Sequence, residues 1–475
     1  MKGEKMELFL SFLLFLLVVS VCVVIISNNK NPVATTAWLI VIIFVPLIGL
    51  LLYLLLGMNY RKNRLYHKLF AANIFPQGSR QRPASDHSSR RSERFEQMVY
   101  RSCLQPATFH NETELYFSGE PWLKQMLRDI RQAKHHIHLE FFIWKADNTG
   151  QLLRDALLEK AREGVHIRIL LDRLGCWRIA YLHRHFLKPL LVHPNVSFSW
   201  FYPTRVPFIQ VRINYRNHRK IVVIDGQVAY TGGMNIGDEY VAGGRFSSWR
   251  DAQLRIRGEA AHSLQMVFLI DWYTATKEDL FDPVYFPAVE TEGRRGVQIV
   301  PGGPDQKWES IAQAYFAMIN EAKHELLITT PYLIPDDALL MALKTAALRG
   351  VDVKLLFPAR PDHVFVYWAS SSYFDELLQA GVKIYLYQRG FLHAKIMVCD
   401  NLVASVGSAN LDFRSLYTNF EINALLYSPE DILLLRTQFF QDLRHAREVT
   451  REELQQQPWW IRFRNSFARL FSPLI

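Results

Sequence analysis

Residues 218–226 read HRKIVVIDG, and residues 393–401 read HAKIMVCDN. Both segments fit the pattern H-x-K-x4-D. In both, a glycine lies seven residues beyond the aspartate and an asparagine lies ten beyond it; these are Gly232 and Asn235, and Gly407 and Asn410. One such match could arise by chance in a chain of this size. Two matches with the same downstream spacing indicate a duplication.

Each motif predicts a β-hairpin. The runs Ile221–Ile224 and Ile396–Cys399 are rich in β-forming residues. Residues two apart on a strand share a face, so each histidine points the same way as its lysine. Asp225-Gly226 and Asp400-Asn401 are two-residue hairpin signals. The returning strand should therefore bring the glycine and the asparagine back beside the histidine.

An imidazole, an ammonium and a carboxamide at one point suit phosphodiester chemistry. A neutral histidine can attack phosphorus and form a covalent phosphoenzyme. A second histidine can protonate the leaving alkoxide and then deprotonate the incoming alcohol. Lysine and asparagine can stabilise the extra negative charge without a metal ion. Because one hairpin supplies only one histidine, the chemistry requires that both hairpins face each other.

The motifs lie inside a longer repeat. Residues 130–172 read as a helix end, an apolar strand, a helix and a second strand, and residues 319–358 read in the same order. Ala-Lys stands before the first strand and Gly-Val begins the second strand in both halves. Each half is therefore a βαβ unit in a sheet covered by helices. We expect an α/β protein made of two duplicated domains packed face to face.

The N-terminus carries two uncharged apolar runs, Leu8–Ile26 and Ala37–Leu56. Each is long enough to cross a bilayer as a helix, with Pro46 inside the second span. A cleaved signal peptide is the alternative for the first run, but its apolar stretch is long and no small-x-small cleavage site follows. The basic residues of 61–68 predict that both ends of the hairpin lie in the cytoplasm.

The remaining composition is that of a globular protein. The chain has 475 residues, 55 Lys+Arg against 45 Asp+Glu, and a formal net charge of +10. Its four cysteines have no paired spacing, which excludes a disulfide scaffold and a cysteine-rich zinc site. The basic balance indicates an anionic partner, and the apolar runs favour a lipid surface over nucleic acid. Residues 77–94, rich in Ser, Arg, Gln and Pro, are typical of a solvated linker.

The twin motifs resemble those of the phospholipase D superfamily, and the spans, repeats and late segment GSANLDFRSLYTNFEIN resemble the bacterial cardiolipin synthases. This resemblance implies two α/β/α repeats in a pseudo-twofold arrangement with one active site at their interface. It also implies a phosphatidyltransferase that converts two phosphatidylglycerols to cardiolipin and glycerol through a phosphohistidine. No cofactor and no metal is implied.

The resemblance assigns roles residue by residue. His218 and His393 become nucleophile and acid/base, with His218 chosen as nucleophile. The phosphate-binding residues it implies are Lys220, Lys395, Asn235, Asn410, Ser408 and Gly233, of which Gly233 departs from the Gly-Ser pattern that Gly407-Ser408 keeps. Glu421 matches a histidine-orienting carboxylate, and Asp251 is its expected counterpart. Asp225 and Asp400, the last residues of the motifs, are expected to serve structure more than chemistry.

These inferences give a layout of five parts: 1–58, two transmembrane helices; 59–105, a basic juxtamembrane segment and linker; 106–290 and 291–457, the two repeats; and 458–475, a basic aromatic tail. The tail fits either the headgroup region of a membrane or packing against the catalytic domain. We expect a multi-pass protein of the bacterial inner membrane that acts on phosphatidylglycerol and anionic lipids, not on nucleic acid. A phospholipase D hydrolase, a membrane-attached nuclease and a silent scaffold are the alternatives.

Overall fold

The computed structural model describes residues 2–27, 32–53, 90–201, 215–289 and 291–472. They fall into two compact units. One unit holds the N-terminal helices (Met1–Tyr60 with Thr204–Tyr215), and the other holds Arg61–Pro203 and Arg216–Ile475.

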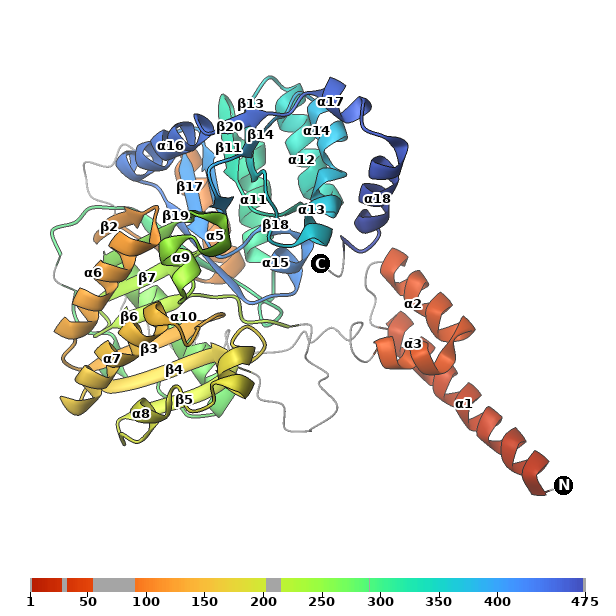
Figure 1. Ribbon diagram of the computed structural model, residues 1–475, viewed down its shortest axis with the longest axis horizontal. Helices are drawn as coiled ribbons and strands as arrows, with labels where there is room; N and C mark the ends of the chain where they lie inside the picture. Colours follow the sequence, from red (N-terminus) through yellow and green to blue (C-terminus); the bar gives the residue numbers. More distant parts are fainter. Residues whose placement is uncertain (1, 28–31, 54–89, 202–214, 290, 473–475) are drawn as a thin grey trace. The chain divides into compact units, whose positions relative to one another are not determined.

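The N-terminal unit consists of apolar helices (Figure 1). Helix α1 covers Lys2–Ser27, and its stretch Lys5–Ser27 is, among the described residues, the one helix long and apolar enough to span a bilayer. The second predicted span is not continuous, because α2 covers Pro32–Phe44 and α3 covers Pro46–Leu52. The proline at position 46 has no N–H and its ring crowds the preceding turn, so the helix breaks there. Positions 54–56 of that prediction lie outside the described residues.

The three helices pack on one another. Ile25 of α1, Ile42 of α2 and Leu50 of α3 are buried in one small apolar cluster. The Trp38 and Tyr53 rings meet edge to face, with centroids 5.4 Å apart. The two apolar runs therefore form a helical hairpin even though the second is broken.

The first repeat is built on a seven-stranded mixed sheet. Its βαβ core pairs β3 with β4 in parallel, and the motif strand β6 runs antiparallel to β3. In sheet order the strands are β2 (Asn111–Tyr116), β9 (Gln253–Gly258), β7 (Val228–Gly232), β6 (Ile221–Ile224), β3 (His136–Phe141), β4 (His166–Asp172) and β5 (Val196–Phe201).

The second repeat has a nine-stranded sheet whose central strands have the same order and directions. Strand β11 pairs in parallel with β13 and antiparallel with the motif strand β16. In sheet order the strands are β1 (Ala107–Thr108), β10 (Val297–Gly302), β19 (Glu421–Leu426), β17 (Val403–Gly407), β16 (Ile396–Cys399), β11 (Glu325–Thr329), β13 (Asp352–Pro358), β14 (Lys383–Tyr387) and β20 (Ala446–Glu448).

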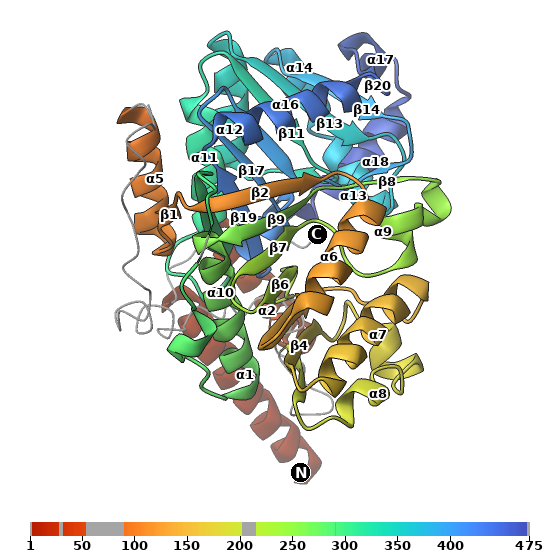
Figure 2. The same cartoon turned by 90° about the vertical axis from the view of Figure 1, so that its left-hand side faces the viewer.

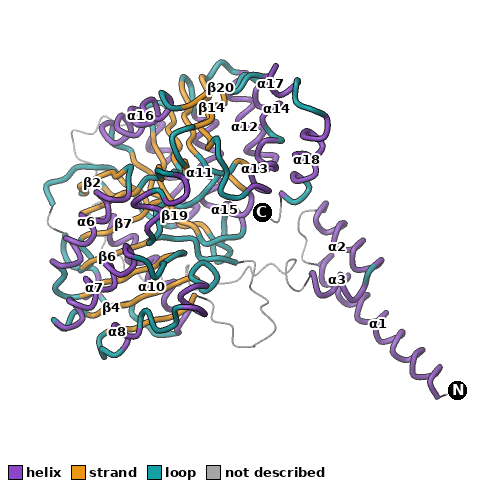
Figure 3. Tube along the Cα trace, in the orientation of Figure 1, coloured by secondary structure: helices purple, strands orange, loops and turns teal. Residues whose placement is uncertain are grey.

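Helices cover both sheets, so the predicted pair of α/β/α repeats is confirmed (Figures 1 and 3). In the first repeat, α6 (Gly119–Gln132) contacts β2 and α7 (Asn148–Arg162) contacts β4. Helix α10 (Glu259–Thr276) contacts β3, β5, β6 and β9. In the second, α11 (Ser310–Glu321) and α12 (Asp337–Leu348) contact β10 and β13, and α16 (Pro429–Leu443) contacts β16 and β17. Helix α10 is buried from Ala260 to Trp272 because it also contacts β10 of the other repeat. A helix buried this far must pair its polar groups, and Asp271 pairs here with Arg219.

Shorter elements complete the unit (Figure 2). The short helices are α8 (Lys188–Leu191), α9 (Asp238–Ala242), α13 (Val364–Ser371), α14 (Phe374–Gln379), α15 (Phe413–Tyr417), α17 (Arg451–Gln455) and α18 (Trp459–Arg469). The short strands are β8 (Trp249–Arg250), β12 (Leu333–Ile334), β15 (Phe391–Leu392) and β18 (Leu411–Asp412).

The segment before the first repeat departs from the predicted layout. Residues Arg90–Cys103 form helix α5, whose Phe95, Val99 and Cys103 are buried in the core of the second repeat. Strand β1 pairs with β10 and so also joins the second sheet. This helix was not predicted, because residues 77–94 are rich in Ser, Arg and Gln, which are typical of a linker. The apolar residues that recur every four positions begin only after Arg94. Positions 77–89 of the predicted linker lie outside the described residues.

The predicted hairpins are present, with one more residue in each turn than expected. Strand pairing runs from Ile224 to Val228 and from Cys399 to Val403, so three residues lie in each turn. Asp225 and Asp400 have φ of 52° and 48°, in the left-handed region that Asp tolerates better than most residues. Gly226 follows with φ of 66°, where the absence of Cβ removes the strain.

Candidate active site

His218 is held by groups from the other repeat. Its backbone N–H donates to the Phe420 carbonyl at 2.8 Å. Its Nδ1 lies 2.9 Å from Oε2 and 3.0 Å from Oε1 of Glu421, on strand β19. An ionised carboxylate can only accept, so His218 donates through Nδ1 and leaves Nε2 for chemistry.

His393 repeats this arrangement in the opposite direction. Its backbone N–H donates to the Arg250 carbonyl at 2.7 Å, and its Nδ1 lies 2.7 Å from Oδ2 of Asp251. The strands that end just before His393 and Asp251, β15 and β8, pair in parallel across the repeat boundary. Each histidine is thus oriented by a carboxylate of the other half. The sequence did not predict that each histidine is paired with a carboxylate of the other half, because along the chain each carboxylate follows the histidine of its own half.

The two motif lysines lie beside the histidines and are buried. Lys220 Nζ donates to the His218 carbonyl at 2.6 Å, and Lys395 Nζ donates to the His393 carbonyl. Burial lowers the pKa of Lys220 to about 7 and that of Lys395 to about 8. Each lysine also depresses the pKa of His218, so charges from both halves act on one site.

The histidines are neutral near pH 7, and their carboxylate partners are ionised. Burial lowers the pKa of His393 to about 4, and burial also lowers the pKa of His218. Burial alone would raise the pKa of Asp251, but the adjacent His393 and Lys395 hold it at about 2. The pKa of Glu421 is lowered in the same way, against the effect of burial, by His218 and Lys220. A neutral imidazole with Nδ1–H donated to a carboxylate is a nucleophile poised at Nε2.

The glycine and serine that follow the motifs serve the carboxylates. Ser408 donates to Glu421 Oε2, and its Oγ accepts the Ile422 N–H at 2.9 Å. A Cβ on Gly233 would lie 2.0 Å from Oδ1 of Asp251. The departure from Gly-Ser in the first half therefore has a steric cause, since Asp251 occupies the space that a serine would need.

The two asparagines differ in their surroundings. Asn235 accepts the Ile143 N–H at 3.1 Å and donates to the Tyr240 hydroxyl at 2.9 Å. Asn410 is buried, and its Oδ1 has no hydrogen-bond partner among the described residues. An amide oxygen cannot donate to a phosphate, so a phosphate contact by either asparagine would have to come from its Nδ2, and the predicted contact stays a prediction.

The motif aspartates lie at the far ends of the hairpins. Asp225 accepts the backbone N–H groups of Lys134, His135 and His136 at 2.8–2.9 Å. Asp400 accepts those of Lys323, His324 and Glu325 at the same distances. Each carboxylate anchors its turn to the start of the neighbouring strand, β3 or β11, and this is the geometry of a structural residue.

Sequence reasoning did not single out Arg219. The side chain is buried, pairs with Asp271 of α10 and donates to the Glu421 carbonyl at 3.0 Å and the Gly302 carbonyl at 2.9 Å. Through these bonds Arg219 connects the first motif to strand β19, which carries Glu421, the partner of His218. The available signal was the difference between HRK and HAK, since Ala394 occupies the equivalent position of the second motif.

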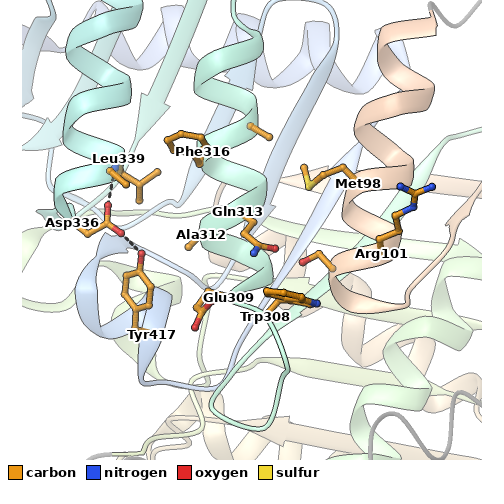
Figure 4. A pocket seen from close by; sticks show the side chains of 13 residues that line it. Met98, Arg101, Trp308, Glu309, Ala312, Gln313, Phe316, Asp336, Leu339 and Tyr417 are labelled. Carbon is orange, nitrogen blue, oxygen red and sulfur yellow. Dashed lines mark hydrogen bonds between the residues drawn. The ribbon is translucent and has the colours of Figure 1, made fainter. Parts of the chain in front are cut away.

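A separate pocket of about 630 Å³ lies between α5, α11, α12 and α15, and none of the predicted catalytic side chains lines it (Figure 4). At one end Tyr417 donates to Asp336, which also accepts the Leu339 N–H at 2.7 Å as the N-cap of α12.

Among the described residues no group of three or more His, Cys, Asp or Glu could hold a metal ion.

Two H-x-K-x4-D hairpins on duplicated α/β domains, each histidine backed by a carboxylate, define a phospholipase D-like protein. The comparisons agree with this class. The family model described as "Cardiolipin synthase, PLD-like domain" matches residues 126–265 and 315–443, one stretch in each repeat. The model described as "Phospholipase_D-nuclease N-terminal" matches residues 15–57.

Individual relatives show which family of phospholipase D-like proteins the chain belongs to. A cardiolipin synthase of Geobacillus kaustophilus is 43% identical over 493 residues, covering 100% of this chain and 95% of the relative. The major cardiolipin synthase of Bacillus subtilis is 39% identical, with 99% of each chain covered. The phosphatidylserine synthase of Haemophilus influenzae has a similar fold, with a TM-score of 0.59 at 18% identity over 81% of this chain and 100% of that one. The chain belongs to the cardiolipin synthase family of the phospholipase D superfamily, as its motifs predicted.

Proposed function

We propose that the protein joins two phosphatidylglycerol molecules into cardiolipin and releases glycerol, through a phosphatidyl-histidine intermediate. The observation that carries the proposal is the pair of crossed histidine–carboxylate contacts, His218 with Glu421 and His393 with Asp251. Both histidines are therefore oriented at one interface by the same device. The names of the relatives support the same reaction.

In the first half-reaction, His218 Nε2 attacks the phosphorus of the donor. The N–P bond forms as the P–O bond to the headgroup glycerol breaks, and His393 gives its Nε2 proton to the leaving oxygen. Burial keeps His393 neutral before substrate binds. The negative charge of a bound phosphodiester favours the imidazolium form, so substrate binding and protonation of His393 are coupled.

In the second half-reaction, a hydroxyl of another phosphatidylglycerol gives its proton to His393 and attacks the same phosphorus. The O–P bond of cardiolipin forms, the N–P bond breaks, and His218 returns to its neutral form. Lys220 and Lys395 stabilise the charge on the phosphoryl oxygens in both steps. Because one phosphodiester replaces another, no nucleotide is consumed.

Transfer requires that water stays out of the site. The side chains of His218 and His393 are 13% and 9% exposed, and their carboxylate partners are fully buried. A positioned lipid alcohol then competes well with water, because an oriented neighbour acts at a very high effective concentration. Poorer exclusion of water would turn the same residues into a hydrolase that releases phosphatidic acid.

The substrate is a lipid, and we propose that two parts of the chain bind the bilayer. The helices α1 to α3 form a multi-pass anchor. The basic residues of 61–68, which lie outside the described residues, favour a catalytic unit in the cytoplasm, because positive charge marks the cytoplasmic side of a membrane protein. In the catalytic unit, α18 packs on α13 through its buried Asn465 and Ala468. Trp459 and Phe463 on its outer side are 71% and 64% exposed. Exposed aromatic rings with intervening arginines are typical of helices at the headgroup level.

The direct test uses purified full-length protein in micelles of phosphatidylglycerol, without nucleotide or added metal. We expect cardiolipin and glycerol in equal amounts. His218→Asn and His393→Asn should each abolish turnover, because each removes one of the two proton or phosphoryl carriers. Phosphatidic acid as the main product would indicate a hydrolase, and DNA cleavage without lipid turnover would indicate a nuclease. Full activity in either variant would overturn the two-histidine mechanism.

A further inference from the structure

Two arginines, one from each repeat, lie beside the strand that holds the partner of His218. The Phe420 N–H donates to the Arg216 carbonyl at 2.8 Å, and the Asn419 N–H donates to the Arg414 carbonyl at 2.9 Å. The next residue, Glu421, contacts His218. The backbones of Arg216 and Arg414 therefore flank the same short segment at the entry of β19.

The backbone places Arg216 on the same face of its segment as His218. It precedes His218 by two residues, and residue 217 forms a parallel bridge with residue 420, so the segment is extended there. Residues two apart in an extended segment share a face. The Arg216 guanidinium lies 3.6 Å from Asp172, a carboxylate close enough to Lys220 to raise the pKa of that lysine against the effect of burial.

The carboxylates around the two arginines have other partners. Asp172 accepts the backbone N–H groups of Leu174 and Gly175, both at 2.9 Å, and of Asn217 at 3.1 Å, in addition to facing Arg216. Asp412 accepts the Ser415 N–H at 2.7 Å as the N-cap of α15. Asp172 faces Arg216 and Asp412 raises the pKa of Arg414, and backbone donors share the charge of both acids.

Electrostatics agree with this geometry. Burial lowers the pKa of Arg414, and the charge of Arg216 lowers it further, against the opposing effect of Asp412. Two guanidinium groups that disfavour each other are stabilised when an anion binds between them. Arginine is also the residue best suited to a phosphate, because its planar donor fork bonds two oxygens at once.

The proposed reaction needs such an anion site, and the inference rests on that proposed function. The acceptor lipid carries a phosphodiester of its own, one glycerol bridge away from the hydroxyl that attacks phosphorus. We propose that Arg216 and Arg414 form a subsite for the phosphate of the acceptor phosphatidylglycerol, next to the site where the donor phosphate is held. The subsite selects an anionic lipid over water or a neutral alcohol in the second half-reaction.

The test compares two acceptors in the same vesicles of labelled phosphatidylglycerol, with 1-butanol added as a neutral alcohol. Cardiolipin and phosphatidylbutanol arise from the same phosphatidyl-enzyme, so their ratio reports the acceptor step alone. In Arg216→Gln and Arg414→Gln we expect this ratio to fall about tenfold, the loss of one charge-assisted hydrogen bond. The phosphatidylbutanol rate should stay within about twofold of the parent.

Matched variants separate the outcomes. Arg216→Lys and Arg414→Lys keep the charge and should recover part of the ratio, and Arg257→Gln, at an exposed position on β9, should leave it unchanged. An unchanged ratio in both glutamine variants, or an equal fall of both products, overturns the subsite. A parent protein that forms neither product overturns the proposed function itself, which is a different result.

Discussion

Replacing Arg219 tests whether the two repeats are held together through the first motif. The guanidinium is buried, and its three nitrogens donate to Asp271 of the first repeat and to the carbonyls of Gly302 and Glu421 in the second. Gly302 and Glu421 are themselves paired in the β10–β19 ladder. One side chain thus fixes both strands of the second sheet against the helix α10.

The expected magnitude follows from what Arg219→Met leaves behind. Methionine fills much of the volume but gives no hydrogen bond, so the Asp271 carboxylate stays buried without its cation. Breaking a buried ion pair by removing one partner costs about 3–5 kcal/mol. The double variant Arg219→Met/Asp271→Asn removes the orphaned charge, and we expect it to recover more than half of that loss. Turnover should fall in the single variant, because Glu421 loses the contact that fixes its backbone.

The assay is urea unfolding of the full-length protein in detergent micelles, followed by tryptophan fluorescence, with turnover measured on the same samples. Arg257→Met, at an exposed arginine, serves as the control and should lie within about 0.5 kcal/mol of the parent. The reasoning is refuted when Arg219→Met unfolds at the same urea concentration as the control. It is also refuted when the double variant is no more stable than the single one.

Three further outcomes are expected. Asp251→Asn removes the charge that orients His393 and should lower kcat about 10³-fold, with little change in the far-ultraviolet circular dichroism spectrum. A loss of kcat below about tenfold would exclude Asp251 as the residue that orients His393. Because the pKa of Lys220 is about 7 and that of Lys395 about 8, kcat/KM should fall as the pH rises through 7–8 and these lysines lose their protons. A flat profile up to pH 9 contradicts this, and Lys220→Arg, which replaces the lysine with the lower pKa, should move the start of the fall to higher pH. Phe463→Ser on α18 should weaken binding of the catalytic unit to anionic vesicles in a flotation assay, while turnover of short-chain lipid in solution is retained.

Much of the fold follows from local patterns along the chain. The β-forming runs IVVI and IMVC, together with the Asp-Gly and Asp-Asn turn signals, predicted both motif hairpins. The matched order of strand, helix and strand predicted the two sheets, because period and turn chemistry are properties of neighbouring residues. The extra residue in each turn was missed, because Asp225 and Asp400 take left-handed φ values while their carboxylates bond to the starts of β3 and β11, which lie far away in the chain.

The sequence by itself determined the two motifs, their duplication and the class of protein, and it named the residues proposed to carry the chemistry. Only the tertiary structure decided which carboxylate orients which histidine, that α5 belongs to the second repeat, and that Arg219 joins the halves. The physical reason is that these contacts cross between repeats. Spacing along a chain specifies which side chains share a strand face or a turn, whereas contacts across an interface arise only when two complete sheets have formed and packed.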